Sequence, residues 1–516
     1  MPVPRPVDAE RAARYRAEGY WDTGTLADGI EAAAHETPGA LALADDTQRL
    51  TWAELRQRVH GARSSLRAWG VGPGDAIVLV TGNTADGVIA YHAALRAGAC
   101  VILLDRRCGR ADLDFARSLV TGDLATLIPR RERERLALDS STYDLESLSS
   151  TTVDDSEIVE PDRDAAAVVL LTSGTTGRPK AVVHSLNTLA HGTANMVAIT
   201  GCTGADVLYL VSPLTSITGV MKMSLSVDRH APLVMTDTFD PSASLDQIAE
   251  YGATVLGGAP VIVERLLAAA QARGITKVSL RTLPLGGAML PRPLLELARD
   301  HFGIEAARVY GSSEAPNFSG SRPSDTRDEA LADDGTITDG GEVRIGSSEH
   351  PDEGLLRGPG LFLGYLDAAD NAAAFEGDWF RTGDLLEVNA GRITVIGRLK
   401  DIVNRNGLKF SPAEIDLALA GYDKVIEVSS YGCADPETTE RLAVAVRPRE
   451  GQTVTLDDVV AYLVAQGVAV RKLPEELVVW DEPLPRTASG KVVRSQLVRE
   501  AAGKHAETVA RLKRRR

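Results

Sequence analysis

The sequence predicts an α/β protein: a large N-terminal domain of layered, mainly parallel sheets with helices, and a small α+β C-terminal domain. Helical patterns alternate with short, fully apolar runs along the first part of the chain, and this pattern changes after Arg398. Fully apolar strands are typical of parallel sheets that are covered on both faces. With 516 residues, the chain also exceeds the roughly 100–200 residues of one ordinary domain.

The first helix is predicted from Thr51, because Thr51 and Glu54 have the spacing of a capping box. Apolar residues then follow at helical spacing, and Gly70 lies near the expected end of the helix. The apolar run 76–80 predicts a strand, the stretch 84–97 a helix, and the run 100–104 a second strand. This alternation predicts parallel strands joined by helices.

Further apolar runs predict more strands of the same kind, at residues 165–171, 207–211, 233–235 and 283–285. Residues 321–341 are polar and rich in Asp and Gly, which predicts surface loops. Beyond Arg398, strands are expected at residues 425–431, 442–446 and 477–480, with a helix at 456–463. We therefore predict an N-terminal domain of residues 1–398 and a C-terminal domain of residues 399–516, with the boundary near Lys400.

The composition excludes several classes of function. Apolar residues make up 44% and charged residues 25%, as in folded globular proteins, and the net charge of −15 argues against a nucleic-acid partner. The four cysteines form no Cys-x-x-Cys pair, which predicts buried or free thiols in a reducing compartment. Neither a signal peptide nor a membrane span is apparent, so we expect a cytoplasmic protein without a membrane partner.

A loop rich in Ser, Thr and Gly follows the apolar run that ends at Leu171, and it ends at Lys180. Its glycines allow close approach of the backbone, its hydroxyls donate hydrogen bonds, and Lys180 adds a positive charge, as a triphosphate requires. The loop is not a Walker P-loop, because Lys180 lies three residues after Gly177. A surface loop without function is the alternative. His184 is interpreted as a structural histidine, with contact to substrate or ATP as the alternative.

Six ordered motifs extend this pattern along the chain. They are residues 50–55 with 97–99, 171–180, 310–314, 381–384, 397–401 and 485–491. Together they resemble the adenylate-forming superfamily of acyl-CoA ligases, aryl-acid activating enzymes, peptide-synthetase adenylation domains and luciferases. The resemblance spans nearly the whole chain.

The resemblance implies ATP as a substrate and assigns its contacts. Tyr310 would stack on adenine near the backbone of residues 286–288, and Asp384 would accept hydrogen bonds from the ribose. Arg398 would reach the ribose or a phosphate. The ATP and AMP contacts implied in this way are Thr172, Ser173, Gly174, Thr175, Thr176, Lys180, Gly287, Ala288, Tyr310, Gly311, Ser312, Ser313, Asp384 and Arg398.

Two residues are implied to be catalytic. Glu314 would bind Mg²⁺, which neutralises phosphate charge while the acid attacks the α-phosphorus and pyrophosphate leaves. Lys491 would stabilise the negative charge that develops there. A turn residue at Asp384, a helix-start carboxylate at Glu314 and a surface lysine at position 491 are the non-functional alternatives.

The resemblance also implies that the C-terminal domain is mobile, with a hinge at Lys400. In one state the loop of Lys491 would serve adenylation, and in a second state residues 406–412 would face the site. Gly407 would let a pantetheine arm or another nucleophile pass close to the backbone. A tight turn before a helix at Pro412 is the structural alternative.

One segment departs from the family pattern. Many relatives carry an aromatic residue and a His or Asn where this chain has Thr215 and Ser216. The departure indicates either drift in a pocket wall or an altered site in which hydroxyls bind the substrate. The expected substrate pocket comprises Thr215, Ser216, Thr218, Gly219 and Gly286.

Three functions remain open. The first is activation of a small acid as an acyl-adenylate, followed by transfer to CoA or a carrier thiol. Residues 14–21 resemble the start of dihydroxybenzoate-type enzymes and of cyclic-acid CoA ligases, which favours a ring-bearing carboxylate. The second is activation of nitrite and transfer to an amine, giving a diazo product, to which the small hydroxyls at 215 and 216 would be suited. The third is a nucleotide-binding protein without catalysis, which would not require both Glu314 and Lys491.

Overall fold

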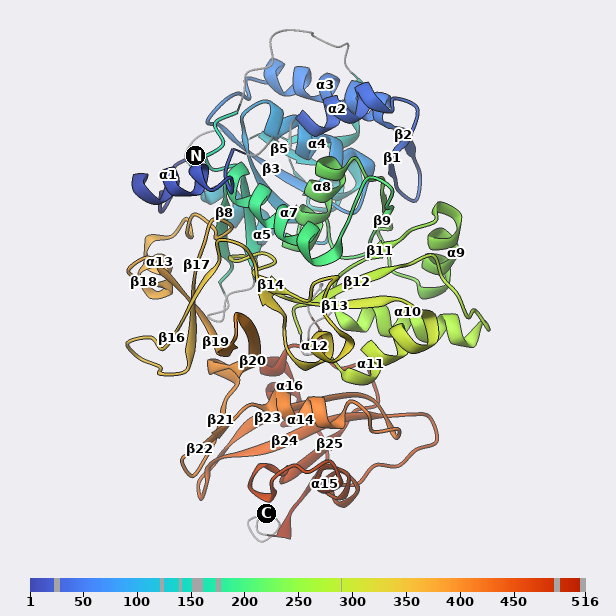
Figure 1. The fold of residues 1–516 in the computed structure, drawn as a ribbon, viewed down its shortest axis with the longest axis vertical. Coiled ribbons are helices and arrows are strands. Elements are labelled where there is room, and N and C mark those ends of the chain that lie inside the picture. The colour runs from blue at the N-terminus through green and yellow to red at the C-terminus, as the bar shows by residue number, and fades with distance from the viewer. Residues whose placement is uncertain are drawn as a thin grey trace.

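The computed structural model describes residues 1–22, 28–120, 125–138, 142–150, 161–172, 178–288, 290–486 and 492–510. Within these residues the chain forms three β-sheets with helices packed around them, and Figure 1 shows the third sheet as a separate unit below the other two. The predicted fold class, a large α/β domain and a smaller α+β domain, is therefore confirmed.

The first sheet is parallel except at one edge, where β8 runs antiparallel to β7. Every residue of β3 is buried, as expected for a parallel strand covered on both faces. In spatial order its strands are β6 (Thr142–Asp144), β5 (Ala125–Ile128), β3 (Ala76–Thr81), β4 (Cys100–Asp105), β7 (Val168–Thr172) and β8 (Lys180–His184).

The helices of this first region begin where the sequence predicts. In α3 (Trp52–Ala68) the Thr51 hydroxyl accepts a hydrogen bond from the Glu54 amide, and the Glu54 carboxylate accepts one from Thr51, which confirms the capping box. Gly70 has a positive φ of 83° just after this helix, a conformation that glycine adopts without strain. The helix α4 (Ala85–Arg96) is capped by Thr84. The other N-terminal helices are α1 (Ala9–Ala17), α2 (Asp28–Glu36), α5 (Arg110–Ser118), α6 (Arg130–Arg135) and the 3₁₀ turn η1 (Leu145–Ser150).

The second sheet is the largest and has two parts. The parallel part has β2 (Arg49–Thr51) antiparallel at its edge and contains β1 (Leu41–Ala44), β10 (Leu233–Met235), β9 (Leu208–Leu210), β11 (Val255–Leu256), β12 (Thr282–Gly286) and β13 (Glu305–Tyr310). Its helices are α7 (Leu186–Thr200), α8 (Ile217–Arg229), α9 (Pro241–Tyr251), α10 (Pro260–Ala272), α11 (Arg292–Glu296) and the π-helical turn η2 (Leu297–His301).

The other part of this sheet is antiparallel, and the sequence did not predict it. Its strands are short or only partly buried, so they lack the continuous apolar runs of the parallel strands. They are β14 (Ser319–Gly320), β15 (Thr336–Ile337), β20 (Arg392–Arg398), β19 (Trp379–Asn389), β17 (Glu353–Arg357), β16 (Glu342–Ile345) and, paired with β19, β18 (Phe375–Glu376). The helix α13 (Ala368–Ala374) precedes β18.

Residues 321–341 are not simply the surface loops that their polar composition predicts. They contain the helix α12 (Arg327–Ala332), which starts with a capping box of Thr326 and Glu329, and the strand β15. The prediction was wrong because two buried positions, Ala330 and Leu331, suffice to anchor this short helix.

The third sheet contains β22 (Leu408–Phe410), β21 (Val403–Arg405), β24 (Thr439–Pro448), β25 (Glu476–Val479) and β26 (Ala506–Thr508), with β23 (Val425–Asp435) also paired with β24. Its helical elements are α14 (Pro412–Leu419), α15 (Leu456–Ala465), α16 (Arg494–Ala501) and the 3₁₀ turns η3 (Leu399–Asp401) and η4 (Val470–Lys472). The chain passes from the large sheet to this one between Arg398 and Val403. The exact domain limits and the hinge at Lys400 stay predictions.

The structure gives the state of the cysteines and the distribution of metal-ligand groups among the described residues. All four cysteines are free thiols, with Cys100, Cys108 and Cys202 buried and Cys433 half-buried. In the ranges given above, no three His, Cys, Asp or Glu side chains gather as a metal site of their own. No helix found in those ranges has both the length and the apolar character to cross a bilayer.

Asn83 ties the first sheet to the large sheet. It follows β3, is only 4% exposed, and donates from its side-chain amide to the carbonyls of Ser212 and Thr236, at 3.1 and 2.9 Å. Its amide oxygen accepts from the Leu214 N–H at 2.7 Å. One side chain thus fixes the segments that follow β9 and β10, because buried polar backbone groups need a partner.

We expect Asn83→Ala to destabilise the N-terminal domain by about 2–3 kcal/mol, because it leaves buried backbone groups without partners. Thermal unfolding followed by circular dichroism measures this as a lower melting temperature. Asn389→Ala, at an exposed position in β19, is the matched control and should change stability by less than about 0.5 kcal/mol. Equal melting temperatures for the two variants would contradict the role given to Asn83.

Candidate functional site

Most of the predicted site residues follow the carboxyl ends of three parallel strands. Residues 215–219 come after β9, residues 286–288 at and after the end of β12, and residues 310–314 at and after the end of β13. Since neighbouring parallel strands end at the same edge of a sheet, the fold brings these segments to one edge. Gly286 permits the close packing there, because a Cβ atom would lie 2.3 Å from the Val309 carbonyl oxygen.

Tyr310, Asp384 and Arg398 are in direct contact. The Tyr310 hydroxyl donates to Asp384 Oδ2 at 3.0 Å, and Arg398 Nε lies 3.0 Å from Asp384 Oδ1. The register of β19 and β20 places Asp384 opposite Arg398. Burial and the adjacent carboxylate raise the pKa of Tyr310 well above its usual value, so the phenol remains a donor. The Asp384 side chain is 8% exposed and that of Arg398 50%, so the cluster is open on the arginine side.

Glu314 and Lys180 lie on two sides of Tyr365. The Tyr365 hydroxyl donates to Glu314 Oε1 at 2.7 Å, and Lys180 Nζ lies 4.6 Å from the centre of the Tyr365 ring. Backbone pairing of β8 with residues 363–366 places Tyr365 beside Lys180. Burial, together with the Glu314 charge, raises the pKa of Tyr365 far above its usual value. The phenol therefore remains protonated and fixes one oxygen of the Glu314 carboxylate.

The strands β7 and β8 on either side of the predicted phosphate loop pair antiparallel, with Thr172 opposite Lys180. The predicted contacts Ser173, Gly174, Thr175 and Thr176 lie outside the described residues. Both basic residues that flank the loop face carboxylates at the start of α13. Arg178 forms an ion pair with Asp367, and Lys180 Nζ lies 3.6 Å from Asp370 Oδ1. A phosphate bound in the loop would compete with these carboxylates for the two cations.

The segment of Ser312 and Ser313 orients Glu314. The Ser312 hydroxyl accepts hydrogen bonds from the backbone N–H groups of Glu314 and Ala315, at 3.2 and 3.3 Å. Gly311 is required for this tight turn, because a Cβ atom would lie 2.7 Å from the Ala315 carbonyl oxygen. The turn explains how Tyr310 and Glu314 face different partners although only three residues separate them.

Glu314 is suited to a magnesium ion that arrives with ATP. A single carboxylate would be a poor site for a metal held by protein groups alone. Mg²⁺, however, commonly takes one or two carboxylates and fills its other positions with water and substrate phosphate oxygens. Because Tyr365 engages one oxygen of Glu314, the second oxygen is the candidate ligand.

His184 is a structural residue, as the sequence interpretation favoured. Its Nε2 lies 2.7 Å from the Ser313 carbonyl oxygen, and its Nδ1 lies 3.0 Å from Thr188 Oγ1. Burial lowers its pKa to about 4, so the ring is neutral at physiological pH. Its hydrogen bond to Ser313 supports the turn that leads to Glu314.

The expected acid pocket begins with a helix cap. The Ser216 hydroxyl donates to the Pro213 carbonyl at 2.6 Å and accepts from the Gly219 N–H at 3.3 Å, which caps α8. Gly219 is required here, because a Cβ atom would lie 2.4 Å from Leu214 Cα. Among the described residues, the hydroxyls of Thr215 and Thr218 have no hydrogen-bond partner, and both residues are half-buried. Substrate binding by these residues stays a prediction.

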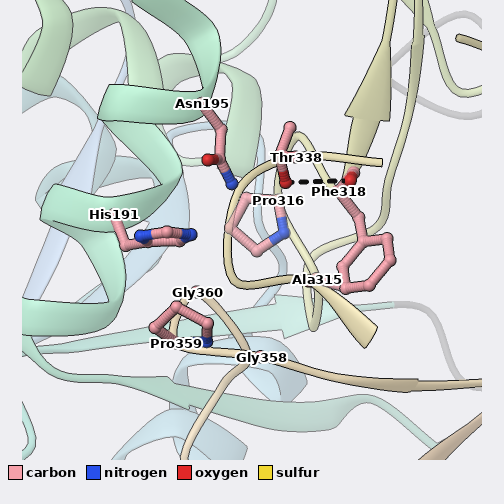
Figure 2. A pocket seen from close by; sticks show the side chains of 10 residues that line it. His191, Asn195, Ala315, Pro316, Phe318, Thr338, Gly358, Pro359 and Gly360 are labelled. Carbon is pink, nitrogen blue, oxygen red and sulfur yellow. Dashed lines mark hydrogen bonds between the residues drawn. The ribbon is translucent and has the colours of Figure 1, made fainter. Parts of the chain in front are cut away.

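A small cavity lies beside Ala315 and Pro316, which follow Glu314 in the sequence. Its volume is about 10 Å³, close to the minimum for one water molecule. Figure 2 shows His191 and Asn195 projecting toward it from one face of α7. Burial lowers the pKa of His191 to about 4. The cavity is lined by His191, Asn195, Ala315, Pro316, Phe318, Thr338, Gly341, Gly358, Pro359 and Gly360, none of which the sequence predicted.

The N-terminal segment that suggested a ring-bearing substrate packs against this same region. Trp21 Nε1 donates to the Pro359 carbonyl at 3.0 Å, and the Tyr20 ring makes an edge contact with His191 at 5.3 Å between centres. These contacts are structural, since they support loops rather than expose a binding surface. Both contacts nevertheless place the segment beside the residues that line the small cavity.

The C-terminal site residues are only partly placed. Lys491 lies outside the described residues, but Arg486 and Val492 on either side of its loop pair as a β-bridge. Arg486 also contacts Glu427 at 3.0 Å, which fixes the base of the loop on the third sheet. Lys400 is exposed in η3. Gly407 forms, with Asn406, the two-residue turn between β21 and β22, where both have positive φ.

Sequence reasoning did not identify two residues that complete the site, Tyr365 and Asn83. Neither belongs to a motif with a recognisable spacing. Tyr365 is placed by backbone pairing with β8, far away in the sequence, and Asn83 by contacts between two sheets. The only local signal was the position of Asn83 between a buried strand and the Thr84 cap.

Comparison with known proteins identifies the family of the chain. The model of the AMP-binding enzyme family matches residues 30–366, and that of the AMP-binding enzyme C-terminal domain matches residues 414–491. The structure resembles o-succinylbenzoate CoA synthetase from Bacillus subtilis in complex with its acyl-adenylate intermediate, with a TM-score of 0.79 at 25% identity. This match covers 91% of the present chain and 97% of the other.

Two similar sequences are ligases of aromatic acids. A salicylyl-CoA synthase / salicylate adenylyltransferase from a Streptomyces species is 30% identical over 97% of this chain and 98% of its own length. The 2-hydroxy-7-methoxy-5-methyl-1-naphthoate–CoA ligase of Streptomyces carzinostaticus is 29% identical over 98% of each chain. The oxalate–CoA ligase of Arabidopsis thaliana is 29% identical, covering 92% of this chain and 98% of its own. The chain therefore belongs to the AMP-binding enzyme family and is an adenylate-forming ligase.

Proposed function

We propose that this enzyme uses ATP to convert a ring-bearing carboxylic acid into its acyl-adenylate, with release of pyrophosphate, and then transfers the acyl group to CoA or a carrier thiol. The observation that carries the proposal is a pair of polar clusters at the two ends of the turn 310–314. Tyr310 contacts Asp384 at one end, and at the other Tyr365 contacts both Glu314 and Lys180. The first is suited to a nucleoside and the second to phosphates with their metal. The aromatic-acid relatives support the ring-bearing substrate.

In the first step a carboxylate oxygen attacks the α-phosphorus of ATP, and the bond to the β-phosphate oxygen breaks. Asp384 would hold the ribose, since its carboxylate is already oriented by Tyr310 and Arg398. Lys180 would hold phosphate oxygens, and Lys491 would stabilise charge beside the α-phosphate. Mg²⁺ bound at Glu314 would supply charge neutralisation. In the second step a thiolate attacks the acyl carbon and AMP leaves.

The relatives lend no support to nitrite as the substrate or to an amine as the acceptor, since the salicylate, oxalate and naphthoate enzymes are ligases of carboxylic acids. The hydroxyl of Ser216, one of the small polar groups that favoured nitrite, is also engaged in capping α8. Adenylation of a carboxylic acid is therefore the function that the site supports best.

ATP–pyrophosphate exchange tests this function. With Mg²⁺, we expect exchange with benzoate-type acids and, after CoA is added, an acyl-CoA product detectable by chromatography. Nitrite, tested with and without an aryl amine, is the comparison arm. Exchange that requires nitrite and occurs with no carboxylic acid would overturn the proposal.

Lys491→Ala should lower the exchange rate by at least about 100-fold, because one stabilising group is lost at the developing charge. The substitution should leave the melting temperature unchanged, which thermal unfolding checks. Lys277→Ala, an exposed lysine before β12, is the matched control and should retain the full rate. A Lys491→Ala enzyme that exchanges as fast as the control would refute the assigned role.

Tyr365 is a positioning residue, and Tyr365→Phe should lower kcat by about 10-fold, since it removes one hydrogen bond to a charged group. The ring that faces Lys180 remains, so the KM for ATP should change little. The Mg²⁺ concentration needed for half-maximal exchange should change, which a merely structural tyrosine would not cause. Tyr209→Phe, which removes a buried hydrogen bond to Gln247, is the control and should leave that concentration unaltered.

A further inference from the structure

A buried lysine lies near the acid pocket and has no role in the site described above. Lys222, in α8, is only 3% exposed. Its Nζ is fully shielded from solvent and has no hydrogen-bond partner among the residues that the structure describes. Lysine is rarely buried in this way, because taking an unpaired ammonium group out of water is costly. A buried ammonium group of this kind suggests that a bound molecule supplies the missing negative charge.

Lys222 lies one helical turn from the residues of the expected acid pocket. Lys222 follows Thr218 by four residues and Gly219 by three, so it lies on their face of α8. Side chains of a helix lean toward its N-terminus, which here is the Ser216 cap. This geometry favours a path of the Lys222 stem past the turn that contains Thr218.

The opposite wall is formed by backbone at the carboxyl ends of β11 and β12. A Cβ atom on Gly257, the residue after β11, would lie 3.6 Å from Lys222 Cε and 2.9 Å from the Pro284 carbonyl oxygen. Pro284 belongs to β12, which ends at Gly286. Lys222 Cε thus lies beside the carboxyl end of β11, and the charged residues Asp206 and Arg281 near its amine precede β9 and β12. The amine therefore lies under the sheet edge where ligands bind in sheets of this kind.

No neighbouring group neutralises the ammonium. Burial lowers the pKa of Lys222 to about 8, while the nearby Cys202 and Asp206 raise it and Arg281 lowers it. Asp206 is engaged elsewhere, because its oxygens accept hydrogen bonds from Arg281 at 2.6 Å and from Thr254 at 2.8 Å. Burial raises the pKa of the Cys202 thiol to about 11, so this neighbour is neutral. At neutral pH the amine therefore remains mostly protonated and lacks a counter-charge.

We propose that Lys222 determines which acid the enzyme accepts, by pairing with a second anionic oxygen that the acid carries in addition to the carboxylate that is adenylated. This oxygen would belong to a second carboxylate or to an acidic phenol. The inference rests on the proposed function, since it requires the acid to occupy the pocket at the start of α8. An acid without such a group would leave the buried ammonium uncompensated, and the enzyme would discriminate against it.

The test compares benzoate with its 2-, 3- and 4-hydroxy and 2-, 3- and 4-carboxy derivatives in ATP–pyrophosphate exchange. We expect wild-type kcat/KM for at least one derivative to exceed that for benzoate by roughly 10- to 100-fold. The hydroxy and carboxy arms distinguish the two sources of the oxygen. In Lys222→Met, which keeps the length of the side chain and removes its charge, this ratio should fall toward unity. Met223→Leu, at the next buried position of α8, should retain the wild-type ratio.

A wild-type enzyme without preference among these acids, or a Lys222→Met variant with an unchanged ratio, would overturn the proposal. Thermal unfolding gives a readout that does not depend on turnover. Without acid, Lys222→Met should melt at or above the wild-type temperature, because it removes an unpaired buried charge. With AMP present, the preferred acid should raise the melting temperature of wild type and not that of the variant.

These two readouts separate failure of this proposal from failure of the proposed function. If no acid supports exchange, the proposed function fails, yet a Lys222-dependent rise in melting temperature would still support binding of the second oxygen. If acids support exchange while Lys222→Met melts lower and keeps the acid preference, Lys222 is only structural.

Discussion

Buried parallel strands constrain where this enzyme can place its chemistry. A parallel strand must be followed by a crossover before the next one begins, so the segments after β9, β11, β12 and β13 all emerge at one edge of the large sheet. The covering helices leave little room on the faces. Backbone approaches closely at this edge, which explains the glycines at positions 257 and 286, where a Cβ atom would collide with neighbouring carbonyl oxygens. The antiparallel strands β19 and β20 then bring Asp384 and Arg398 to the same edge from the other side.

The basic residues proposed to bind phosphate already face carboxylates of the protein. Arg178 and Lys180 face the two carboxylates that begin α13, and Glu314 is held by the phenol of Tyr365. Both ion pairs are partly exposed, so each contributes little to the stability of the fold. A polyphosphate can displace such carboxylates readily. The ion pairs keep the side chains of Arg178 and Lys180 oriented, and breaking them should cost little of the free energy of phosphate binding.

Much of this structure could be predicted from the sequence, because the signals are local. The capping box of Thr51 and Glu54 marked the start of α3, and continuous apolar runs marked β3, β4 and β7. The strands β14 to β20 could not be predicted in the same way, since their burial depends on partners distant in the sequence.

The same distinction applies to the site. Tyr310, Glu314 and Asp384 lie in motifs whose spacing is recognisable, and the structure brings Tyr310 into contact with Asp384. Tyr365 and Lys222 lie in no motif. Tyr365 is placed by a backbone bridge to β8, and Lys222 stands out because it is buried without a hydrogen-bond partner among the described residues. Neither property can be seen in the sequence.

Asn83 anchors the segment between β9 and α8, which contains part of the predicted acid pocket. This anchoring bears on how substrate preference can change in this enzyme family. Asn83 fixes the backbone at Ser212 and Leu214, and the Ser216 cap fixes it again at the start of α8. Thr215 lies between these two anchors and Thr218 just beyond the second, and neither side chain has a hydrogen bond to the backbone among the described residues. Side chains at these positions can therefore be exchanged over generations while the frame that presents them stays in place. The predicted pocket wall can therefore vary in sequence while the stability of the fold is preserved.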